Sequence, residues 1–570
     1  MYSLRNIIYR GLLLLFSSPL SFASVPIPAE QISPLADSPS PYLQMHADDP
    51  VGWRTWERGT LRHADENSKL IFLSSGYFSC HWCHVMQRES FKNHKISRIL
   101  NRSFVSVKID RELSPVVDRD LIDFVRKTTG SAGWPLQVIL LPDGTPLLGF
   151  VYLPPDRLEQ LLLRLEKRWH NNPGELRALA KSVIKDLNKY NVLSSYSNVN
   201  SNGMEASAEM LLDDADMLSG GFGGESKFPE TPHLMEELSL YIKSDNSLLK
   251  EHLIVTLDSM ATLGLRDAVG GGFFRYTIDP DWNIPHFEKM LYDNAQLAQL
   301  YLRAGKIFHR ADYLAVGLET IDFMVKQMRN SDGIFISSLS AVDGNGQEGG
   351  YYLWDRDELE QLLDDGEKSL FDTMWYPHST MLDGDVHLFM PDTNKATRRE
   401  LEDILSIRKK LQRARLERTL PRDHKVLSGW NGLLLSALSE LLRNGEIADA
   451  EYREIGDQLA DTLSTNYWSG DDKKLLRLRG ENSSVVASLD DYAYVADGLF
   501  RWGEATDQNR FKLLAGKIVR AAKGRLYRGG KWHATNVRLL NYSSEIVTGT
   551  AGEALPSPVT VLNRIERLLP

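Results

Sequence analysis

The chain has 570 residues, a formal net charge of −10, and 42% hydrophobic and 25% charged residues. This composition is typical of a soluble globular protein, and the acidic balance argues against nucleic acid as a main partner. A chain of this length is expected to fold as at least two domains, because a single hydrophobic core stops growing well below it.

Residues 1–24 have the features of a signal peptide. Arg5 and Arg10 give a positive start, an apolar run follows, and Ser21-Phe22-Ala23 is a small-x-small cleavage site. An uncleaved membrane anchor is the alternative, but the run is short for a membrane span and Pro19 interrupts it. We therefore expect an exported protein, periplasmic or otherwise, with no stable membrane insertion after the signal is removed.

The segment Cys80-His81-Trp82-Cys83-His84 holds the only two cysteines of the chain. A disulfide that closes so short a loop stabilises a fold by only about 2 kcal/mol, against about 4.7 kcal/mol for a loop of about 100 residues. The pair is a poor structural staple, so thiol chemistry explains it better. Export also places the pair where disulfides persist.

The neighbouring residues place this motif between a strand and a helix. Residues 69–75 form a short apolar run typical of a buried strand, 76–79 supply a turn, and 83–91 have the pattern of an amphipathic helix. Cys80 thus lies near a helix N-terminus, where the dipole and unpaired N–H groups favour a thiolate. We predict that Cys80 is the nucleophile and that Cys83 resolves the mixed disulfide.

Two more strands follow, at 104–109 and 136–141, and Trp134-Pro135 stands directly before the second. A proline in this place, after a Cys-x-x-Cys helix, matches the thioredoxin plan, in which a cis-proline lies against the active disulfide. An ordinary trans proline at a strand start is the alternative. We expect four residues to shape the substrate surface: His81, Trp82, Trp134 and Pro135.

A set of motifs extends well beyond the cysteines. They are Ser38-Pro-Ser-Pro-Tyr-Leu43, His46-Ala47, Asp49-Pro-Val51, Cys80–His84, Glu89-Ser-Phe91, Val107-Lys-Ile-Asp-Arg-Glu112 and Gly133-Trp-Pro-Leu136. With them the chain resembles a bacterial and eukaryotic family, the YyaL-like or spermatogenesis-associated thioredoxin-like proteins, also called DsbH-type. That resemblance implies a thioredoxin-like domain joined to an α/α toroid similar to those of N-acylglucosamine epimerases and six-hairpin glycosidases. It implies the fold more directly than the function, because the family's activity is poorly defined.

Two rival interpretations of the cysteine motif involve a bound group. Cys-x-x-Cys-His is also the attachment pattern of c-type haem, and export is compatible with that chemistry. Zinc held by both cysteines and a histidine is the other, but ligands so close in sequence do not easily close a tetrahedron, and no second Cys/His cluster is visible. The flanking strands and Trp134-Pro135 favour a redoxin. We therefore expect no haem, no other cofactor and no metal.

From about residue 205 onward, helical periodicity dominates the chain. Residues 171–203 are polar and end in a Ser/Asn-rich run, which predicts a linker. The predicted organisation is a signal peptide at 1–24, a thioredoxin-like domain at 25–175, a linker at 176–204 and a helical domain at 205–570.

The helical domain is predicted to form helical hairpins separated by glycine-rich loops. The predicted helices are 206–218, 232–244, 249–263, 286–305, 311–328, 356–364, 399–417, 427–443, 447–466, 490–506, 509–526 and 557–568. The fold class is thus an N-terminal α/β thioredoxin-like domain plus an all-α, (α/α)6-type toroid that is six-hairpin glycosidase-like. A plain α-solenoid is the alternative, but no fixed repeat length supports it.

Three polar clusters in this domain, within 270–294, 425–432 and 490–493, each fall at the start of a predicted helix. In a toroid the N-termini of the inner helices ring one mouth, where pockets form. The first cluster resembles the family's toroid signature. We expect a sugar-like ligand to bind among Arg275, His286, Glu288, Trp430, Asn431 and Asp491. The alternative is that these residues cap helices and pin loops.

The chain departs from the family pattern in ways that argue against catalysis by the toroid. Ala268 stands where the family commonly has a histidine, and Ser340 and Val342 stand where it has acids. Glycoside hydrolysis needs two carboxylates at a defined separation, and no such pair can be named. The chain also ends at Pro570, where family members continue, so we expect an incomplete last hairpin.

These observations lead to two hypotheses of function. The first is an exported thiol–disulfide oxidoreductase that acts on protein thiols or disulfides with an unknown redox partner, while the toroid binds a substrate or ligand. The second is a carbohydrate-binding or carbohydrate-modifying toroid protein with an accessory redoxin domain. The reduction potential of the Cys80–Cys83 pair, which the sequence does not reveal, sets the direction of exchange.

Overall fold

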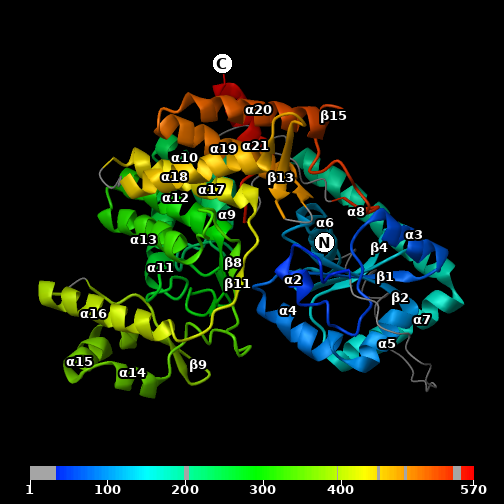
Figure 1. The fold of residues 1–570 in the computed structure, drawn as a ribbon, viewed down its shortest axis with the longest axis horizontal. Helices are drawn as coiled ribbons and strands as arrows, with labels where there is room; N and C mark the ends of the chain where they lie inside the picture. The colour runs from blue at the N-terminus through cyan, green and yellow to red at the C-terminus, as the bar shows by residue number, and fades with distance from the viewer. Residues whose placement is uncertain are drawn as a thin grey trace. The chain divides into compact units, whose positions relative to one another are not determined.

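The structure is a computed structural model that describes residues 34–197, 204–393, 396–445, 450–480, 484–543 and 554–569. The predicted signal peptide at 1–24 lies outside these residues, as do residues 198–203 of the predicted linker. The chain forms two compact units. One runs to Asn200 and takes in a segment that begins at Thr535, and the other begins at Ser201 and holds the rest. Figure 1 shows the sheet of the first unit and the helical hairpins of the second.

The first unit is built on a four-stranded sheet with the strand order β2-β1-β3-β4. β1 (Leu70–Gly76) pairs in parallel with β2 (Phe104–Asp110). β3 (Leu136–Leu140) is antiparallel both to β1 and to β4 (Pro146–Phe150). Every residue of β1, β2 and β3 is buried, as expected for strands covered on both faces. This confirms the predicted α/β thioredoxin-like domain.

Helices flank the sheet and connect its strands. α6 packs against β4, and α5 packs against β2 and α7. α4 runs directly into a π-helical turn at Gln87–Phe91, so the two together fill the predicted helix at 83–91. The helices of this part are α2 (Pro41–Gln44), α3 (Arg58–Glu66), α4 (His81–Met86), α5 (His94–Ser103), α6 (Pro115–Thr129) and α7 (Pro155–Asn171).

The predicted linker at 176–204 is wrong over most of its length, because this stretch forms helix α8 (Pro173–Ser197). Leu176, Ala180 and Leu187 are buried at helical spacing, and Leu187 belongs to the core of the sheet. The apolar stripe of α8 is narrow, and most of its other residues are polar, so the composition of this stretch is like that of a linker. The spacing of the apolar residues is nevertheless that of a helix packed on one face. The thioredoxin-like unit therefore extends past residue 175.

A second correction concerns the C-terminal region, which was assigned to the toroid as far as 570. The segment from Thr535 belongs to the first unit. Leu540 and Tyr542 are buried in the core of the sheet, and Asn541 donates to the Asp143 carbonyl at 2.8 Å. Sequence position alone could not reveal a segment that crosses from one unit to the other.

The second unit consists mainly of helices, and the predicted helices at 206–526 are confirmed to within a few residues, except that the one at 286–305 begins later. Helix α15 was missed. The helices are α9 (Met204–Asp213), α10 (Thr231–Ser244), α11 (Ser247–Thr262), α12 (Leu291–Phe308), α13 (Ala311–Gln327), α14 (Arg356–Leu362), α15 (Asp365–Met374), α16 (Arg398–Arg415), α17 (Ser428–Arg443), α18 (Ala450–Thr462), α19 (Leu489–Ala505), α20 (Asn509–Leu526) and α21 (Pro558–Leu568).

These helices are arranged as an inner row and an outer row. α10, α12, α17 and α19 pack side by side in that order, and each also packs against the helix that follows it in sequence. Most residues of α12, α17 and α19 are buried, as expected for inner helices. This is the predicted α/α toroid. Within the described residues, no helix is long and apolar enough to cross a membrane.

Short strand pairs precede the inner helices. β5 (Tyr276–Thr277) pairs with β6 (Pro285–His286), and β7 (Lys289–Met290) pairs with β8 (Ser338–Leu339). The predicted helix at 286–305 therefore begins only at Leu291, as α12. His286 and Glu288 consequently lie on or between strands rather than on the first turn of a helix.

Candidate functional site

Cys80 and Cys83 form a disulfide with their Cα atoms 5.3 Å apart. Cys80 is the N-cap of α4, and its sulfur accepts the Cys83 backbone N–H at 3.3 Å. The exposed fraction is 4% for Cys80 and 1% for Cys83, so Cys80 is slightly closer to solvent. The predicted order of strand, motif and helix is confirmed, with Cys80 at the helix N-terminus.

Of the residues predicted to shape a substrate surface, His81 and Trp82 lie between the two cysteines, and Trp134 contacts the turn before Cys80. Trp82 is 43% exposed and lies 5.6 Å from the His81 ring, centroid to centroid. The Trp134–Pro135 peptide is cis, as the thioredoxin plan predicts. The Trp134 ring contacts Tyr77 at 5.8 Å, and the Tyr77 carbonyl accepts the Cys80 N–H. The Trp134 segment is thus tied to the turn that holds Cys80.

His84 bears on the haem alternative. Its Nε2–H donates to the Phe78 carbonyl at 2.8 Å, so the ring that would ligate haem iron is engaged within the fold. No group of three or more His, Cys, Asp or Glu side chains suited to a metal ion occurs in the part of the chain that the structure describes. The absence of a haem stays a prediction.

Behind the disulfide, sequence reasoning missed Tyr42. A Cβ on Gly76, the last residue of β1, would collide with the Tyr42 hydroxyl and lie 2.8 Å from the Cys83 sulfur. Both groups therefore occupy the space that the missing side chain leaves open. The Tyr42 side chain is fully buried, and its hydroxyl has no hydrogen-bond partner among the residues that the structure describes.

Lys108 on β2 is a second buried polar group near Tyr42. Its ammonium lies 5.1 Å from the centroid of the Tyr42 ring and 4.4 Å from that of Phe91, and it donates to the Ser74 hydroxyl at 3.0 Å. Burial lowers the pKa of Lys108 to about 7, although the Asp49 carboxylate opposes the shift. Desolvation dominates because the nearest groups are aromatic rings and one hydroxyl.

Asp49 in turn organises the N-terminal motifs. Its carboxylate accepts hydrogen bonds from His46 Nδ1 at 2.6 Å, Trp53 Nε1 at 3.0 Å and Gln87 Nε2 at 3.0 Å. Burial, and then the nearby Lys108, lower the pKa of His46 to about 3. The His46–Asp49 contact is therefore a hydrogen bond from a neutral imidazole rather than an ion pair. Through Gln87, these motif residues are joined to the helical segment that follows the Cys80–Cys83 disulfide.

In the toroid, Arg275, His286 and Glu288 lie close together as predicted. The Arg275 guanidinium is 3.5 Å from the Glu288 carboxylate, and His286 pairs with Glu348. Burial disfavours the imidazolium, but the Glu348 carboxylate raises the pKa of His286 above its usual value. Tyr276, which the sequence did not single out, contacts the His286 ring at 4.9 Å. Glu348 was also missed, because its loop carried no recognisable motif.

Two of the other three predicted toroid residues, Asn431 and Asp491, use their polar atoms inside the fold. Asn431 is fully buried, and its amide accepts the Phe335 N–H at 3.0 Å and donates to the Phe335 carbonyl at 2.9 Å. Asp491 is fully buried, accepts from Ser488 and pairs with Arg477 at 2.7 Å. The predicted ligand-binding roles of Asn431 and Asp491 are therefore wrong, because their polar atoms are used inside the fold.

Trp430, the third of these residues, is almost fully buried and packs against another aromatic ring. Only 4% of its surface is exposed, and its ring lies 4.7 Å from the Tyr292 ring at 57°. It packs α17 against α12, which also join through other side chains. We therefore assign it to helix packing, and its predicted ligand contact stays untested.

Comparisons with known proteins agree with this organisation. A family model described as "Protein of unknown function, DUF255" and named Thioredox_DsbH matches residues 33–188. The "Uncharacterized protein B0495.5" of Caenorhabditis elegans is 31% identical over 518 residues, which cover 82% of this chain and 70% of that protein. Human "Spermatogenesis-associated protein 20" is 31% identical over 536 residues, which cover 82% of this chain and 67% of that protein.

Solved structures resemble the chain more remotely. The cellobiose 2-epimerase from Bacillus thermoamylovorans B4167 is 11% identical, with a TM-score of 0.38, and the match covers 59% of this chain and 78% of the epimerase. A family 76 glycoside hydrolase from a bovine Bacteroides thetaiotaomicron strain is 12% identical, with a TM-score of 0.38, and the match covers 61% of this chain and 57% of the hydrolase. At these scores the likeness supports no statement about function.

The buried Lys108 predicts a pH dependence of stability. Its pKa in the folded protein, about 7, lies below the value near 10.4 of an unfolded lysine. Between these values the unfolded chain holds a proton that the folded chain lacks, so the lysine's contribution to the free energy of unfolding rises with pH. We expect the stability of the wild type relative to Lys108→Met to rise by about 2 kcal/mol between about pH 7.5 and 9.5.

Urea unfolding of both proteins at the two pH values measures this difference. Lys92→Met is the matched control, because it makes the same substitution at an exposed position of the same unit. A difference between wild type and Lys108→Met that stays constant across this window would show that Lys108 is charged in the folded protein.

Proposed function

The chain belongs to the family of spermatogenesis-associated protein 20, and we propose that it is a thiol–disulfide oxidoreductase acting through Cys80 and Cys83. In the reduced protein, the Cys80 thiolate attacks a substrate disulfide and forms a mixed disulfide, releasing one substrate thiol. The Cys83 thiolate then attacks the Cys80 sulfur, which releases the second substrate thiol and leaves the Cys80–Cys83 disulfide. Two electrons pass to the substrate, and the reverse reaction oxidises a substrate dithiol.

The position of Cys80 is the observation that carries this proposal. Its sulfur caps α4 beside the exposed Trp82, whereas the Cys83 sulfur lies against Gly76 and Tyr42. A thiol at a helix N-terminus has a lowered pKa and so reacts first, and a shielded neighbour is suited to resolve the mixed disulfide. The family match over residues 33–188, to a model named Thioredox_DsbH, supports a thioredoxin-like domain around this motif.

The proposed setting is an exported, disulfide-permitting compartment, which the leader-like residues 1–24 support. Such a compartment holds protein thiols and disulfides as substrates, and it requires a redox partner that restores the working form of the pair. The exposed Trp82 and the half-buried Trp134 give a substrate polypeptide an aromatic surface to contact.

Single cysteine substitutions test the mechanism with insulin as disulfide substrate and dithiothreitol as the source of electrons. Cys80→Ser should abolish exchange, because no thiolate starts the reaction. Cys83→Ser should accumulate the mixed disulfide with Cys80, because the resolving thiol is missing. Non-reducing electrophoresis and mass spectrometry detect that adduct, and the double variant is the control that forms none.

The order of alkylation gives an independent check. Cys80 should react with iodoacetamide before Cys83 in the fully reduced protein. Faster reaction at Cys83, or insulin reduction that persists in Cys80→Ser, would exclude the roles assigned here.

A second candidate function is carbohydrate binding or modification by the toroid, with the redoxin as an accessory domain. The observation that favours it is the cluster of Tyr276, His286, Glu288 and Glu348, which puts a histidine, two carboxylates and an aromatic ring near one another. Aromatic rings and carboxylates are the groups that bind sugars, and paired acids can catalyse glycoside hydrolysis.

We expect this cluster to bind a small polar ligand with weak or no glycosidase activity, because Arg275 already engages the Glu288 carboxylate. A glycan array and a hydrolase panel on the full chain, repeated with Glu288→Gln, test this expectation. The control is Glu360→Gln, on the surface helix α14. Turnover that Glu288→Gln removes and Glu360→Gln leaves intact would establish a catalytic toroid.

A further inference from the structure

A cavity of about 520 Å³ opens between α13 and α16 of the second unit. Its wall includes Glu319 and Phe323 of α13, Arg408 and Arg415 of α16, and Lys289 of β7. None of the residues predicted from the sequence to bind a sugar belongs to its lining. Cavities of this volume accommodate molecules the size of a sugar or a small cofactor.

The floor of the cavity carries more positive than negative charge. Lys289 Nζ lies 2.7 Å from the Asp267 carboxylate, and Arg415 Nη1 lies 2.8 Å from the same group. All three side chains are at least 95% buried. Two buried cations thus share one buried carboxylate, and charge left unbalanced in a low-dielectric site attracts an anion strongly.

The glycine-rich loop explains how this floor is built. Gly271 and Gly272 have φ values of 75° and 73°, which favour glycine, and the Gly271 carbonyl accepts from Lys289 Nζ at 2.7 Å. A Cβ on Gly270 would lie 2.8 Å from Asp267 and 3.3 Å from Arg415. The three glycines therefore let the backbone close tightly around the ion group.

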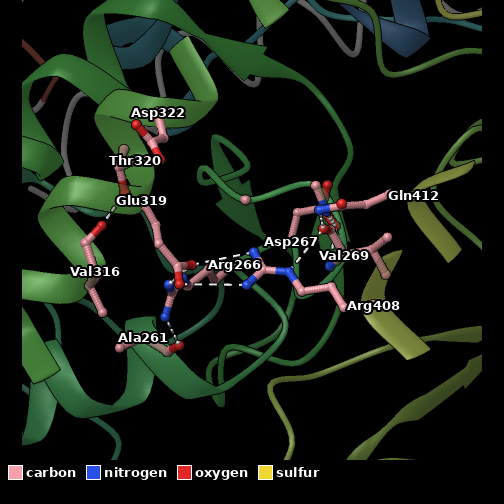
Figure 2. Close-up of polar contacts among 12 residues, drawn as sticks. Ala261, Arg266, Asp267, Val269, Val316, Glu319, Thr320, Asp322, Arg408 and Gln412 are labelled. Carbon is pink, nitrogen blue, oxygen red and sulfur yellow. Dashed lines mark hydrogen bonds and ion pairs between the residues drawn. The ribbon is translucent and has the colours of Figure 1, made fainter. Parts of the chain in front are cut away.

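One wall repeats the same imbalance, as Figure 2 shows. The Glu319 carboxylate lies 2.8 Å from Arg266 and 3.3 Å from Arg408. Arg408 and Gln412 also donate to the Val269 carbonyl, at 3.1 and 2.7 Å, which fixes α16 to the loop. As at the floor, two cationic side chains share one carboxylate.

The rim adds charge that is not paired. Lys409 and Arg413 line the cavity, are exposed, and make no ion pair within the described residues. The lining as a whole has six Lys or Arg side chains against three Asp or Glu, in a chain whose formal net charge is −10. The positive surplus is thus local to this cavity and runs against the charge of the whole protein.

We propose that this cavity binds a sugar-sized organic anion, whose phosphate or carboxylate pairs with the cations and whose body packs on the aromatic wall. The half-buried Tyr351 and the buried Phe323 supply that wall. A sugar ring presents C–H groups that pack on aromatic faces, and an arginine fork binds a phosphate or a carboxylate in two-point fashion. Lys409 and Arg413 then face the anionic group from the rim.

Calorimetry on the full chain tests this proposal with four probes: glucose 6-phosphate, glucuronate, inorganic phosphate and glucose. We expect one of the two sugar anions to bind and glucose to give no heat. Which of the two binds distinguishes a phosphate from a carboxylate ligand. Binding of inorganic phosphate alone, or of glucose as tightly as either anion, would overturn the proposal.

Substitutions at the rim locate the binding. The double variant Lys409→Gln/Arg413→Gln should weaken the affinity about tenfold, because two charged contacts are lost while the buried ion groups stay intact. Arg398→Gln, which removes a 94% exposed cation from the first turn of the same helix, should leave the affinity unchanged. Affinity that is unaffected by the double variant would place the ligand elsewhere and contradict the proposal.

A second inference concerns Tyr42 and rests on the proposed redox function. The short helix α2 holds Tyr42 in place, because Ser40 both caps α2 at Leu43 N and donates to Asp110 at 2.5 Å. The Tyr42 hydroxyl and the Cys83 sulfur share the space beside Gly76. A fully buried hydroxyl without a partner is unfavourable, and a thiolate accepts a hydrogen bond better than a disulfide sulfur does.

We infer that Tyr42 is a positioning residue that donates a hydrogen bond to the Cys83 thiolate in the reduced protein. This bond stabilises the thiolate that resolves the mixed disulfide and is absent from the disulfide form. No atom is transferred, because the tyrosine keeps its proton. Tyr42 therefore favours the reduced pair and helps to supply the resolving thiolate.

Tyr42→Phe removes the hydroxyl and keeps the ring. We expect the mixed disulfide to be resolved about tenfold more slowly and the equilibrium with glutathione to shift about tenfold toward the disulfide, which is about −30 mV in potential. Tyr542→Phe is the matched control, because it removes a hydroxyl that contacts Asp123 in the same unit.

The two possible failures are distinguishable. If Cys80 forms no mixed disulfide in the wild type, the proposed function itself fails. If Cys80 reacts normally but Tyr42→Phe matches the wild type in both resolution rate and potential, only the role of Tyr42 is excluded.

Discussion

The missing side chain of Gly76 is the constraint on which the packing around the Cys80–Cys83 disulfide depends. β1 ends there, and a single Cβ at that point would collide with the Tyr42 hydroxyl and press on the Cys83 sulfur. The segment before the sheet can therefore pack directly beneath the disulfide. Ser40, Tyr42, His46 and Asp49 come from that segment, and their contacts join the ends of β1 and β2 to α4. The N-terminal motifs are thus part of the structure that surrounds the disulfide, although they precede the first strand of the sheet.

In the second unit, groups of charged side chains hold together elements that are far apart in sequence. Asp267 pairs with both Lys289 and Arg415, and Glu319 pairs with both Arg266 and Arg408. These ion groups join α13, α16 and the glycine-rich loop, which are distant in sequence. Removing Asp267 would leave two buried cations unpaired, and breaking even a simple buried pair costs about 3–5 kcal/mol. Lys289, Arg408 and Arg415, which join these elements, also line the cavity beside them and contribute to its positive surplus of charge.

The sequence was informative wherever a local pattern determines structure. The place of the Cys-x-x-Cys motif between strand and helix and the helices of the second unit follow from short-range periodicity. The cis Trp134–Pro135 peptide was expected from the resemblance to the thioredoxin plan. It failed where a segment makes long-range contacts, as with α8 and the segment from Thr535. Helical wheels do not reveal that Leu187 and Tyr542 enter the same core. Tyr42, Lys108 and Glu348 were missed for a related reason, since their importance comes from neighbours far along the chain.

The toroid shows why polar residues at helix starts are ambiguous in sequence. Asn294 on α12 and Asn431 on α17 make the same kind of contact, because each amide binds both the N–H and the carbonyl of a phenylalanine, Phe273 or Phe335. Phe273 lies in the loop before α12, whereas Phe335 lies in the loop after α13, far from α17 in sequence. A buried amide whose donors and acceptor are all used by the backbone has none left for a ligand. These asparagines at the starts of inner helices therefore serve to join the helices to loops of the same unit. Groups that share a counter-ion or stand at a cavity rim, such as Arg408 and Arg413, retain the capacity to bind a ligand. Chemical type alone does not separate the two kinds of residue, whereas the partners of each polar atom do.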